Sequence, residues 1–274
     1  MKLYDYVIKT PLKKWDYKRL TTNSSISIEE IDNSPDLPWD YQLISNNHSI
    51  TWDDIINYPE IKWKYNFLSS NPNITMGIIK DTPDIPWSYH YLSNNPNINM
   101  EYVHQEKDKN WSYNLLAGNS GISMDDIQQY RHLFTDDDFI CMNPNINLDI
   151  IHETNMDIQL NGNLLSSNPS ITWDIVLKYP EIDWNYDILS FNPNITMDVL
   201  YDYPQYDWSI TYLSKNPNIS IYLINTNQHL LWDYDKFSLN PAISPSIVED
   251  NPHIKWNYGI LSGNPMKPIM GFGV

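Results

Sequence analysis

Residues 184–207 read WNYDILSFNPNITMDVLYDYPQYD and form one copy of a 24-residue unit that recurs along almost the whole chain. Its opening tryptophan returns every 24 residues on both sides of one irregular unit. The anchor positions are Trp15, Trp39, Trp63, Trp87, Trp111, Thr135, Leu160, Trp184, Trp208, Trp232 and Trp256. An asparagine lies eight residues after every anchor, and an isoleucine lies eleven residues after each of the first ten. Columns this regular identify a tandem-repeat protein of eleven units.

The first half of each unit has the signals of a short helix. Asp, Ser or Asn usually follows the anchor, as at Asp40, Ser88 and Asn185, and these residue types are good N-caps. A tryptophan before the cap and an apolar residue four positions after the cap form the hydrophobic-staple pattern. The segment ends at Asn-Pro in eight units, for example Asn192-Pro193, because proline cannot continue a helix.

The second half of each unit repeats the same signals. The isoleucine precedes Ser, Thr or Asn, as in Ser27 and Thr51, and an apolar residue such as Ile31 follows four positions later. Each helix is about two turns long and would be unstable alone, so neighbouring units must stack. The capped segments and Asn-Pro stops argue against a β-solenoid, which the many β-branched residues would otherwise suit.

These signals predict an all-α fold, an α-solenoid of about eleven 24-residue two-helix repeats in the form of a superhelical rod. A 24-residue unit is short for two full α-helices, so one of the pair can be partly 3₁₀. We expect residues 1–14 to be an N-terminal cap, residues 15–264 to be the solenoid with an irregular unit at 135–159, and residues 265–274 to be a C-terminal tail.

Composition narrows the class of protein. The 274 residues carry a net charge of −17, and 41% of them are hydrophobic, which suffices for a packed core. An acidic chain repels phosphate, so we expect no nucleic-acid partner. No apolar run is long enough to span a membrane, and the first 15 residues lack a signal-peptide pattern. The single cysteine, Cys141, cannot form an internal disulfide, which favours a reducing compartment.

The recurring tryptophans and asparagines are predicted to be structural. Large apolar residues replace one another at Trp52, Trp173 and Met197, which share a slot, and such exchange indicates burial. We expect the asparagine column to satisfy loop backbone groups of its own or the next unit and to form a ladder. The residues assigned to these structural roles are Trp39, Trp63, Trp87, Trp184, Trp208, Asn71, Asn95, Asn192 and Asn216.

Catalytic chemistry finds little support. The sequence has no HExxH motif, no glycine-rich phosphate loop and no Cys/His metal spacing. His104 and His152 share a slot two units apart, roughly 20 Å if packed helix layers are 8–10 Å apart. The run Asp136, Asp137 and Asp138 lacks the ligand ladder of a calcium loop and is predicted to be a charged first helical turn. We therefore expect a protein that is not an enzyme and has no catalytic residue, bound metal or cofactor.

Two resemblances rest on the repeat itself. The phrase Leu-Ser-x-Asn-Pro-Asn-Ile-Thr, at residues 68–75 and 189–196, resembles the leucine-rich repeat variant family, whose 24-residue units pair one α-helix with one 3₁₀-helix. The chain departs from that family in its Trp-x-Tyr opening and in having only two Ala and two Arg. The longer pattern Trp-x-Tyr-x-x-Leu-Ser-x-Asn-Pro-Asn-Ile-Thr, over roughly residues 15–264, is similar to tandem-repeat proteins of amoeba-infecting giant viruses related to mimivirus. This second resemblance implies an origin but no particular activity.

The predicted function is a non-enzymatic scaffold that binds another protein through its extended repeat surface, as a monomer in the host cytoplasm or the virion. The alternative is a structural component of a virus particle that assembles by solenoid–solenoid contacts. Variable slots on a constant frame are where such a protein can encode a partner, although drift on solvated faces explains the variation equally well. In the second helix the variable slot comprises Lys80, His104, Gln128, His152, Tyr201 and Asn225. In the first helix it comprises Lys18, Gln42, Asn66, His90, Asn114, Asp138, Asp187 and Asp235.

The irregular unit at 135–159 is the other candidate for partner binding. Thr135 replaces the anchor tryptophan, Cys141 replaces the usual serine, and one residue is added between Asn155 and Ile158. Lost indole volume and the three consecutive aspartates, Asp136 to Asp138, predict a bend or a specialised site here. A decayed repeat would look the same in the sequence.

Overall fold

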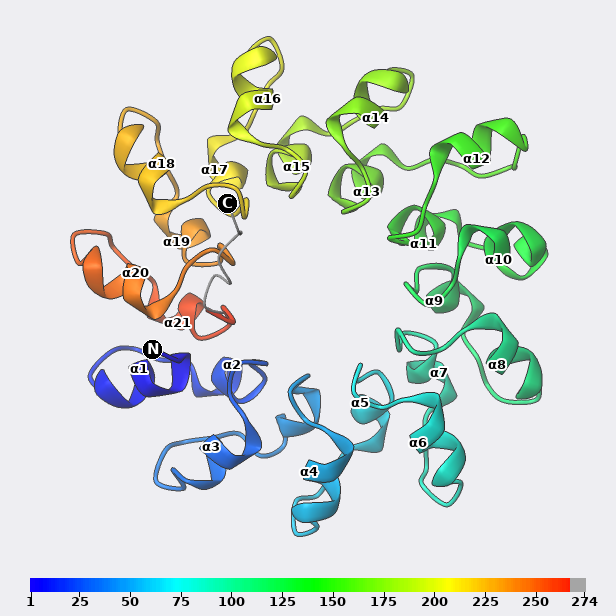
Figure 1. The fold of residues 1–274 in the computed structure, drawn as a ribbon, viewed down its shortest axis with the longest axis horizontal. Helices are drawn as coiled ribbons and strands as arrows, with labels where there is room; N and C mark the ends of the chain where they lie inside the picture. Colours follow the sequence, from blue (N-terminus) through cyan, green and yellow to red (C-terminus); the bar gives the residue numbers. More distant parts are fainter. Residues whose placement is uncertain (267–274) are drawn as a thin grey trace, which may run out of the picture. The chain divides into compact units, whose positions relative to one another are not determined.

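The computed structural model describes residues 1–266, and this range is built from helices and turns with no strand (Figure 1). Each of the first ten repeats contributes a first helix after its anchor and a second helix after its isoleucine, and the eleventh contributes a first helix, which confirms the predicted all-α repeat. The first helices are α2 (Tyr17–Thr21), α5 (Tyr65–Ser69), α7 (Tyr89–Leu92), α9 (Tyr113–Ala117), α11 (Asp137–Met142), α13 (Gly162–Ser167), α15 (Tyr186–Phe191), α17 (Ile210–Leu213), α19 (Tyr234–Phe237) and α21 (Tyr258–Leu261). The second helices are α3 (Ile28–Asp32), α4 (Trp52–Asn57), α6 (Met76–Asp81), α8 (Met100–Gln105), α10 (Met124–Gln129), α12 (Leu148–Glu153), α14 (Trp173–Lys178), α16 (Met197–Asp202), α18 (Ile221–Thr226) and α20 (Pro245–Asp250).

Three elements fall outside this alternation. Helix α1 (Leu3–Lys9) precedes the first repeat. The 3₁₀-helix η1 (Ile44–Asn46) takes the place of the first helix in the second repeat, and η2 (Arg131–Leu133) follows α10. Within the described range, a 3₁₀-helix therefore takes the place of one helix of the pair in the second repeat only, and the other helix pairs are α-helical.

The helix starts follow the predicted capping. Asn99 precedes α8, and its side chain accepts a hydrogen bond from the Tyr102 amide at 2.9 Å. Ser123 precedes α10 and forms a reciprocal capping box with Asp126, each side chain accepting from the other residue's amide. These caps satisfy amides that have no partner inside so short a helix.

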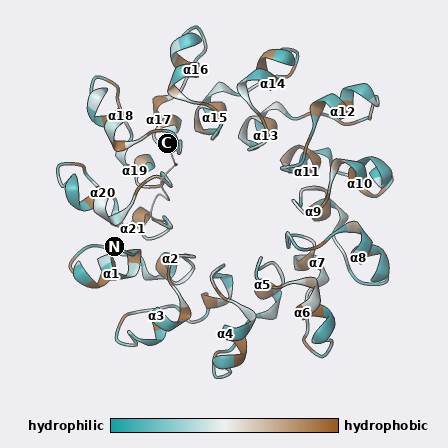
Figure 2. Ribbon diagram, viewed as in Figure 1, coloured by the Kyte–Doolittle hydropathy of each residue, from teal (hydrophilic) through white to brown (hydrophobic). Residues whose placement is uncertain are grey.

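A constant set of side chains makes the core. In the fourth repeat, Leu92, Ile98 and Val103 are at most 1% exposed, and the same slots are buried in the other described repeats except at Leu200, which has intermediate exposure. Figure 2 shows hydrophobic residues gathered on the first helices and at the crossings between the two helices, and hydrophilic residues on the distal turns of the second helices. Burial of these apolar surfaces between neighbouring repeats supplies the stability that the separate helices lack.

The chain divides into two compact units. One unit comprises Met1–Ile50, Asn57–Ile61 and the described residues from Tyr186 onward, and the other comprises Thr51–Ile56 and Lys62–Asn185. Within the second unit the first helices pack in sequence, α5 on α7, α9 on α11 and α11 on α13. Within the first unit α15 packs on α17 in the same way.

The first unit contains both ends of the described chain, and they are in contact. The amide of Asp16 donates to Ser262 Oγ at 2.8 Å. The side-chain amide of Asn23 donates to the carbonyls of Ser262 and Asn264, both at 2.9 Å. Within this unit, the first and last repeats are therefore neighbours, and the predicted superhelical rod stays a prediction. Of the predicted C-terminal tail, only Pro265 and Met266 lie within the described residues.

Candidate functional site

The asparagine column forms the predicted ladder between repeats. Asn95 is fully buried, and its Nδ2 donates to the carbonyls of Ser69, Asn71 and Ile74 in the preceding repeat at 2.9–3.0 Å. Its Oδ1 accepts from the Asn97 amide at 2.9 Å. Equivalent bonds to the preceding repeat are made by Asn47, Asn119, Asn143, Asn168, Asn216, Asn240 and Asn264. Buried backbone groups need such partners, so no other side chain fits this position equally well.

A second ladder, which the sequence analysis did not identify, uses the residue two positions before each asparagine. Ser93 is fully buried, and its Oγ accepts from the Ser112 amide of the next repeat at 2.9 Å. The Oγ also donates to the Tyr89 carbonyl one turn earlier. Cys141 occupies this slot in the irregular repeat, where its Sγ accepts from the Asn161 amide at 3.4 Å. Burial raises the pKa of the Cys141 thiol, so this cysteine replaces a serine in the ladder rather than supplying a reactive thiolate.

The anchor tryptophans also have a polar role that periodicity did not reveal. Trp184 Nε1 donates to the carbonyl of Tyr179, the C-cap of α14, at 2.9 Å. The same bond to the residue five positions back is made by Trp15, Trp39, Trp111, Trp208, Trp232 and Trp256. Each of these indoles therefore satisfies a carbonyl at or just after the end of a second helix, and most of them also bury their ring. Trp39, Trp87 and Trp184 are buried as predicted, while Trp63 and Trp208 have intermediate exposure.

Arg131, four residues before the substituted anchor and therefore in the fifth repeat, makes polar contacts beside the position of the missing indole. Arg131 donates to the carbonyls of Phe134 and Asp157 and pairs with Asp137 at 2.5 Å. Phe134, next to the substituted anchor, is 1% exposed. The added residue is accommodated at Asn155, whose φ of 49° is the left-handed conformation that ends a helix in a Schellman motif. The structure therefore compensates for both departures from the repeat.

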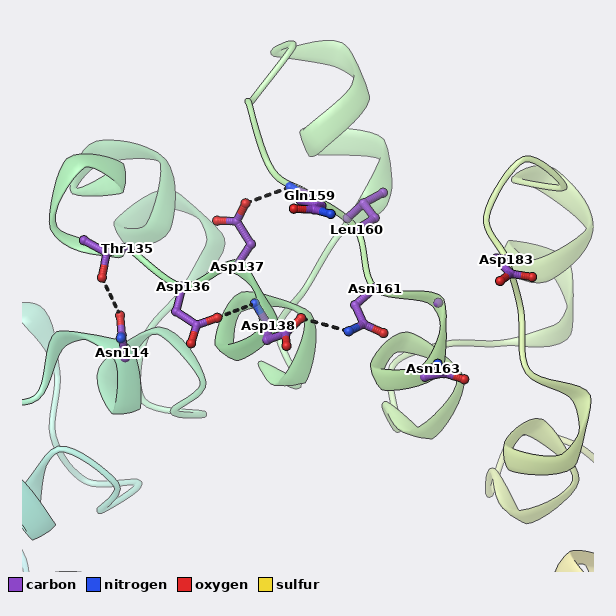
Figure 3. A pocket seen from close by; sticks show the side chains of 11 residues that line it. Asn114, Thr135, Asp136, Asp137, Asp138, Gln159, Leu160, Asn161, Asn163 and Asp183 are labelled. Atoms are coloured by element: carbon purple, nitrogen blue, oxygen red, sulfur yellow. Dashed lines mark hydrogen bonds between the residues drawn. The ribbon is translucent and has the colours of Figure 1, made fainter.

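The three consecutive aspartates form the charged first turn that the sequence predicts. Asp136 caps α11, and Asp137 and Asp138 lie in its first turn. With Asn114, Asn161, Asn163 and Asp183, among others, they line an open polar hollow of about 850 Å³ (Figure 3).

The three consecutive aspartates of this hollow already have hydrogen-bond partners. Asp137 binds Arg131 and also accepts from the Gln159 amide at 2.7 Å. Asp138 accepts from the side-chain amide of Asn161 at 2.9 Å. These bonds give the aspartates a structural role that joins adjacent repeats, and their predicted part in partner binding stays a prediction.

Arg131 offers a test of this compensation. We expect Arg131→Ala to lower the free energy of unfolding by about 2 kcal/mol, because two carbonyls and a half-buried carboxylate lose their partner. The matched control is Arg19→Ala, since Arg19 pairs with Asp16 at 3.4 Å while remaining half exposed, and we expect a change within about 0.5 kcal/mol. Urea unfolding of both variants measures the difference. Equal small losses would show that Arg131 does not compensate for the anchor.

The variable second-helix slot lies on the surface. All six of its residues are exposed, and Tyr201 is 62% exposed. Three positions before the slot, on the same helical face, stand exposed acids in four of these repeats. We call this set the second-helix surface: Lys80, His104, Gln128, His152, Tyr201 and Asn225 with Glu101, Asp125, Asp149 and Asp198.

Some of these side chains also touch the next repeat. The His104 ring lies 4.7 Å from that of Tyr130, and the His152 ring stacks on Tyr179 at 4.7 Å. Asp149 accepts from Lys178 Nζ at 2.8 Å and from the Tyr179 hydroxyl, which holds the pKa of its carboxyl below the usual range. The second-helix surface is thus held in place between neighbouring repeats while it remains exposed.

Some residues of the first-helix slot bond to the next repeat, and others are exposed to solvent. Asn114, Asp138 and Asp235 each accept a side-chain hydrogen bond from the beginning of the next repeat, at 2.9–3.2 Å. Gln42, Asn66 and His90 are exposed. Part of this slot therefore joins repeats, which the sequence analysis did not anticipate.

No match to this chain is found among family models, curated proteins or solved structures. Within residues 1–266 no group of His, Cys, Asp and Glu side chains is placed to hold a metal ion. None of the helices in that range is both long and apolar enough to cross a membrane.

Proposed function

We propose that this chain is a non-enzymatic repeat scaffold that binds another protein through the second-helix surface. One observation supports the proposal above the others. The residues that stay constant from repeat to repeat lie in the core and in the hydrogen-bond ladders, whereas the variable second-helix slot is exposed on successive helices. In the second unit Lys80, His104, Gln128 and His152 lie on α6, α8, α10 and α12, four second helices in a row. A regular array of exposed positions suits an extended protein partner better than a small ligand.

The charge of this surface indicates the chemistry of the partner. Glu101, Asp125, Asp149 and Asp198 accompany the slot on the same helical faces, and the whole chain has a net charge of −17. Opposite charge steers association and excludes unsuitable partners. We therefore propose that the partner presents a basic surface.

Two matched triple variants test which surface binds. His104→Lys, Gln128→Lys and Tyr201→Lys add three positive charges to the second-helix surface. Gln42→Lys, Asn66→Lys and His90→Lys add three positive charges to exposed first-helix positions. In affinity capture from infected cells followed by titration of the captured protein, we expect the first triple to weaken binding about tenfold or more, since like-charge contacts are costly. We expect the second triple to bind as the native chain does.

Two outcomes would contradict the proposal. Equal binding by both triples and the native chain would attribute the variation in the slots to drift. Loss of binding only in the first-helix triple would mean that the partner binds the first helices rather than the second helices. Thermal unfolding of both triples, with unchanged midpoints expected, separates binding from folding.

Origin and location form part of the same proposal. The giant-virus resemblance supports a viral protein that acts in the host cytoplasm or the virion. A particle component built by solenoid–solenoid contacts is the alternative, and light scattering over a concentration series distinguishes the two. A mass that stays monomeric favours the scaffold, and growing polymers favour the particle component.

A further inference from the structure

Helix α1 stands where the second helix of the last repeat is expected. In a regular repeat the second helix ends six residues before the next anchor, as α8 ends at Gln105 before Trp111. Helix α1 ends at Lys9, six residues before Trp15. The last repeat has its anchor and first helix, α21, but α21 is the final helix of the described chain. The described residues therefore start with a helix in the register of a second helix and finish with a first helix.

Aromatic contacts around α1 match those inside a regular repeat. Trp111 packs edge-on against Tyr89, on the preceding first helix, and Tyr102, on the preceding second helix, with ring centroids 4.9 and 6.0 Å apart. In the same way Trp15 packs edge-on against Tyr258 of α21 and Tyr6 of α1, at 5.2 and 5.8 Å.

Tyr102 and Tyr6 also have pKa values shifted in the same direction by the same causes. Burial raises the pKa of Tyr102, and a hydrogen bond with Tyr89 raises it further. Burial raises the pKa of Tyr6 likewise, with a hydrogen bond to Tyr258. Tyr6 therefore has the same relation to Tyr258 that Tyr102 has to Tyr89 within one continuous repeat.

Helix α1 is also paired with a second helix on each side. Lys9 Nζ lies 2.6 Å from Glu249 of α20, the second helix of the tenth repeat. Lys2 Nζ lies 3.2 Å from Glu30 of α3, the second helix of the first repeat. Leu3, Tyr6 and Val7 are at most 3% exposed between these neighbours. A cap on the first repeat alone would explain the contact with α3 but not the contacts with α20 and α21.

We infer that the eleventh repeat is assembled from both ends of the chain, with α21 as its first helix and α1 as its second. The repeat length agrees. Trp256 to Met266 is 11 residues and Lys2 to Lys14 is 13, which together make the 24 of one unit. Met1 and Met266 fall on the same slot, ten residues after an anchor.

This assembly restricts how copies of the chain can associate. The faces of the first and last repeats that an open stack would offer to a second copy are used within the first unit, through Asp16, Asn23 and Ser262. End-to-end association then requires release of α1 from α20, α21 and α3. The inference is independent of the proposed scaffold function, because it concerns contacts within one chain.

A circular permutant gives a direct test. The permutant omits Met1 and residues 267–274, joins Met266 directly to Lys2, and opens new ends between Asp108 and Lys109, two exposed residues that follow α8. Because the joined repeat has the native length, we expect a folded monomer whose unfolding midpoint is no more than about 3 °C below that of the native chain.

A matched pair of substitutions keeps the inference testable if the permutant does not fold. Val7 and Val103 occupy the same slot, and each is 1% exposed. In the native chain order we expect Val7→Asp to speed amide exchange about tenfold or more at both Leu20 in α2 and Ser262 after α21. Val103→Asp, which breaks a continuous repeat, should speed exchange around α7 and α8 instead.

The two experiments can overturn the inference together. An unfolded permutant, combined with a Val7→Asp variant that speeds exchange at Leu20 and leaves Ser262 unchanged, would show that α1 is a cap on the first repeat only. A folded permutant, or faster exchange at both Leu20 and Ser262, supports the split repeat.

Discussion

Replacing Asn95 by alanine is expected to lower the free energy of unfolding by about 2–4 kcal/mol. The substitution removes one donor group that serves three carbonyls and one acceptor that serves the Asn97 amide. The Asn95 side chain and its three carbonyl partners are buried, the Asn97 amide is partly buried, and an unsatisfied buried polar group costs about 1–3 kcal/mol. Urea unfolding of the native and Asn95→Ala chains gives the difference directly.

Two further variants attribute the loss to hydrogen bonds. Asn94→Ala, at the exposed neighbour, should change stability by less than about 0.5 kcal/mol. Asn95→Asp keeps the size of the side chain but replaces the donor Nδ2 by an oxygen that can only accept. This oxygen would face three carbonyl oxygens, so the substitution should cost at least as much as alanine. If Asn95→Asp were nearly as stable as the native chain, volume rather than hydrogen bonding would explain the column.

The repeat and its helices could be predicted because their causes are local. A tryptophan every 24 residues, an N-cap after it and an Asn-Pro stop each act within a few residues, and Ser123 and Asn99 cap their helices as expected. The invariance of the asparagine also implied a ladder, because a side chain that never changes beside a changing proline needs a backbone partner. The prediction placed the partners in the same or the next repeat, whereas the carbonyls belong to the preceding repeat, a direction that depends on packing and not on spacing within one unit.

The contact between the chain ends could not be predicted from the same signals. It pairs Asp16 with Ser262, 246 residues apart, and depends on how each repeat rotates on its neighbour. Small changes in the packing between repeats alter that rotation without changing any capping residue or any residue that recurs every 24 positions. In hindsight one signal was present: residues 3–9 lie in the register of a second helix, six residues before Trp15.

The candidate site likewise has features that could be predicted from the sequence and features that could not. Exposure of the second-helix slot followed from its variation in size and charge. The structural duties of Asn114, Asp138 and Arg131 were missed, because each bonds to a partner that no fixed spacing within one unit identifies. Compensation by Arg131 in particular spans 26 residues, from its own position to the carbonyl of Asp157.

Replacing Trp184 by alanine is expected to be the most damaging single change, at about 3–5 kcal/mol of unfolding free energy. The side chain is 7% exposed, so its loss leaves a large cavity between stacked repeats. It also removes the indole N–H that donates to the Tyr179 carbonyl, at 2.9 Å, where α14 ends. A loss of this size would unfold much of a marginally stable chain at room temperature, so the measurement should start in a stabilising buffer.

Trp184→Phe separates the two contributions of the indole. Phenylalanine keeps most of the apolar volume but cannot donate to the Tyr179 carbonyl, so we expect a cost of about 1–2 kcal/mol, well below that of alanine. Leu160, the natural anchor of the seventh repeat, shows that the frame tolerates an apolar anchor without the N–H. If Trp184→Ala left the unfolding midpoint unchanged but abolished partner capture, the tryptophan column would be a recognition surface, and its assignment to the core would be wrong. If Trp184→Phe cost as much as alanine, the bond to the end of α14 rather than ring burial would explain why tryptophan occupies this position.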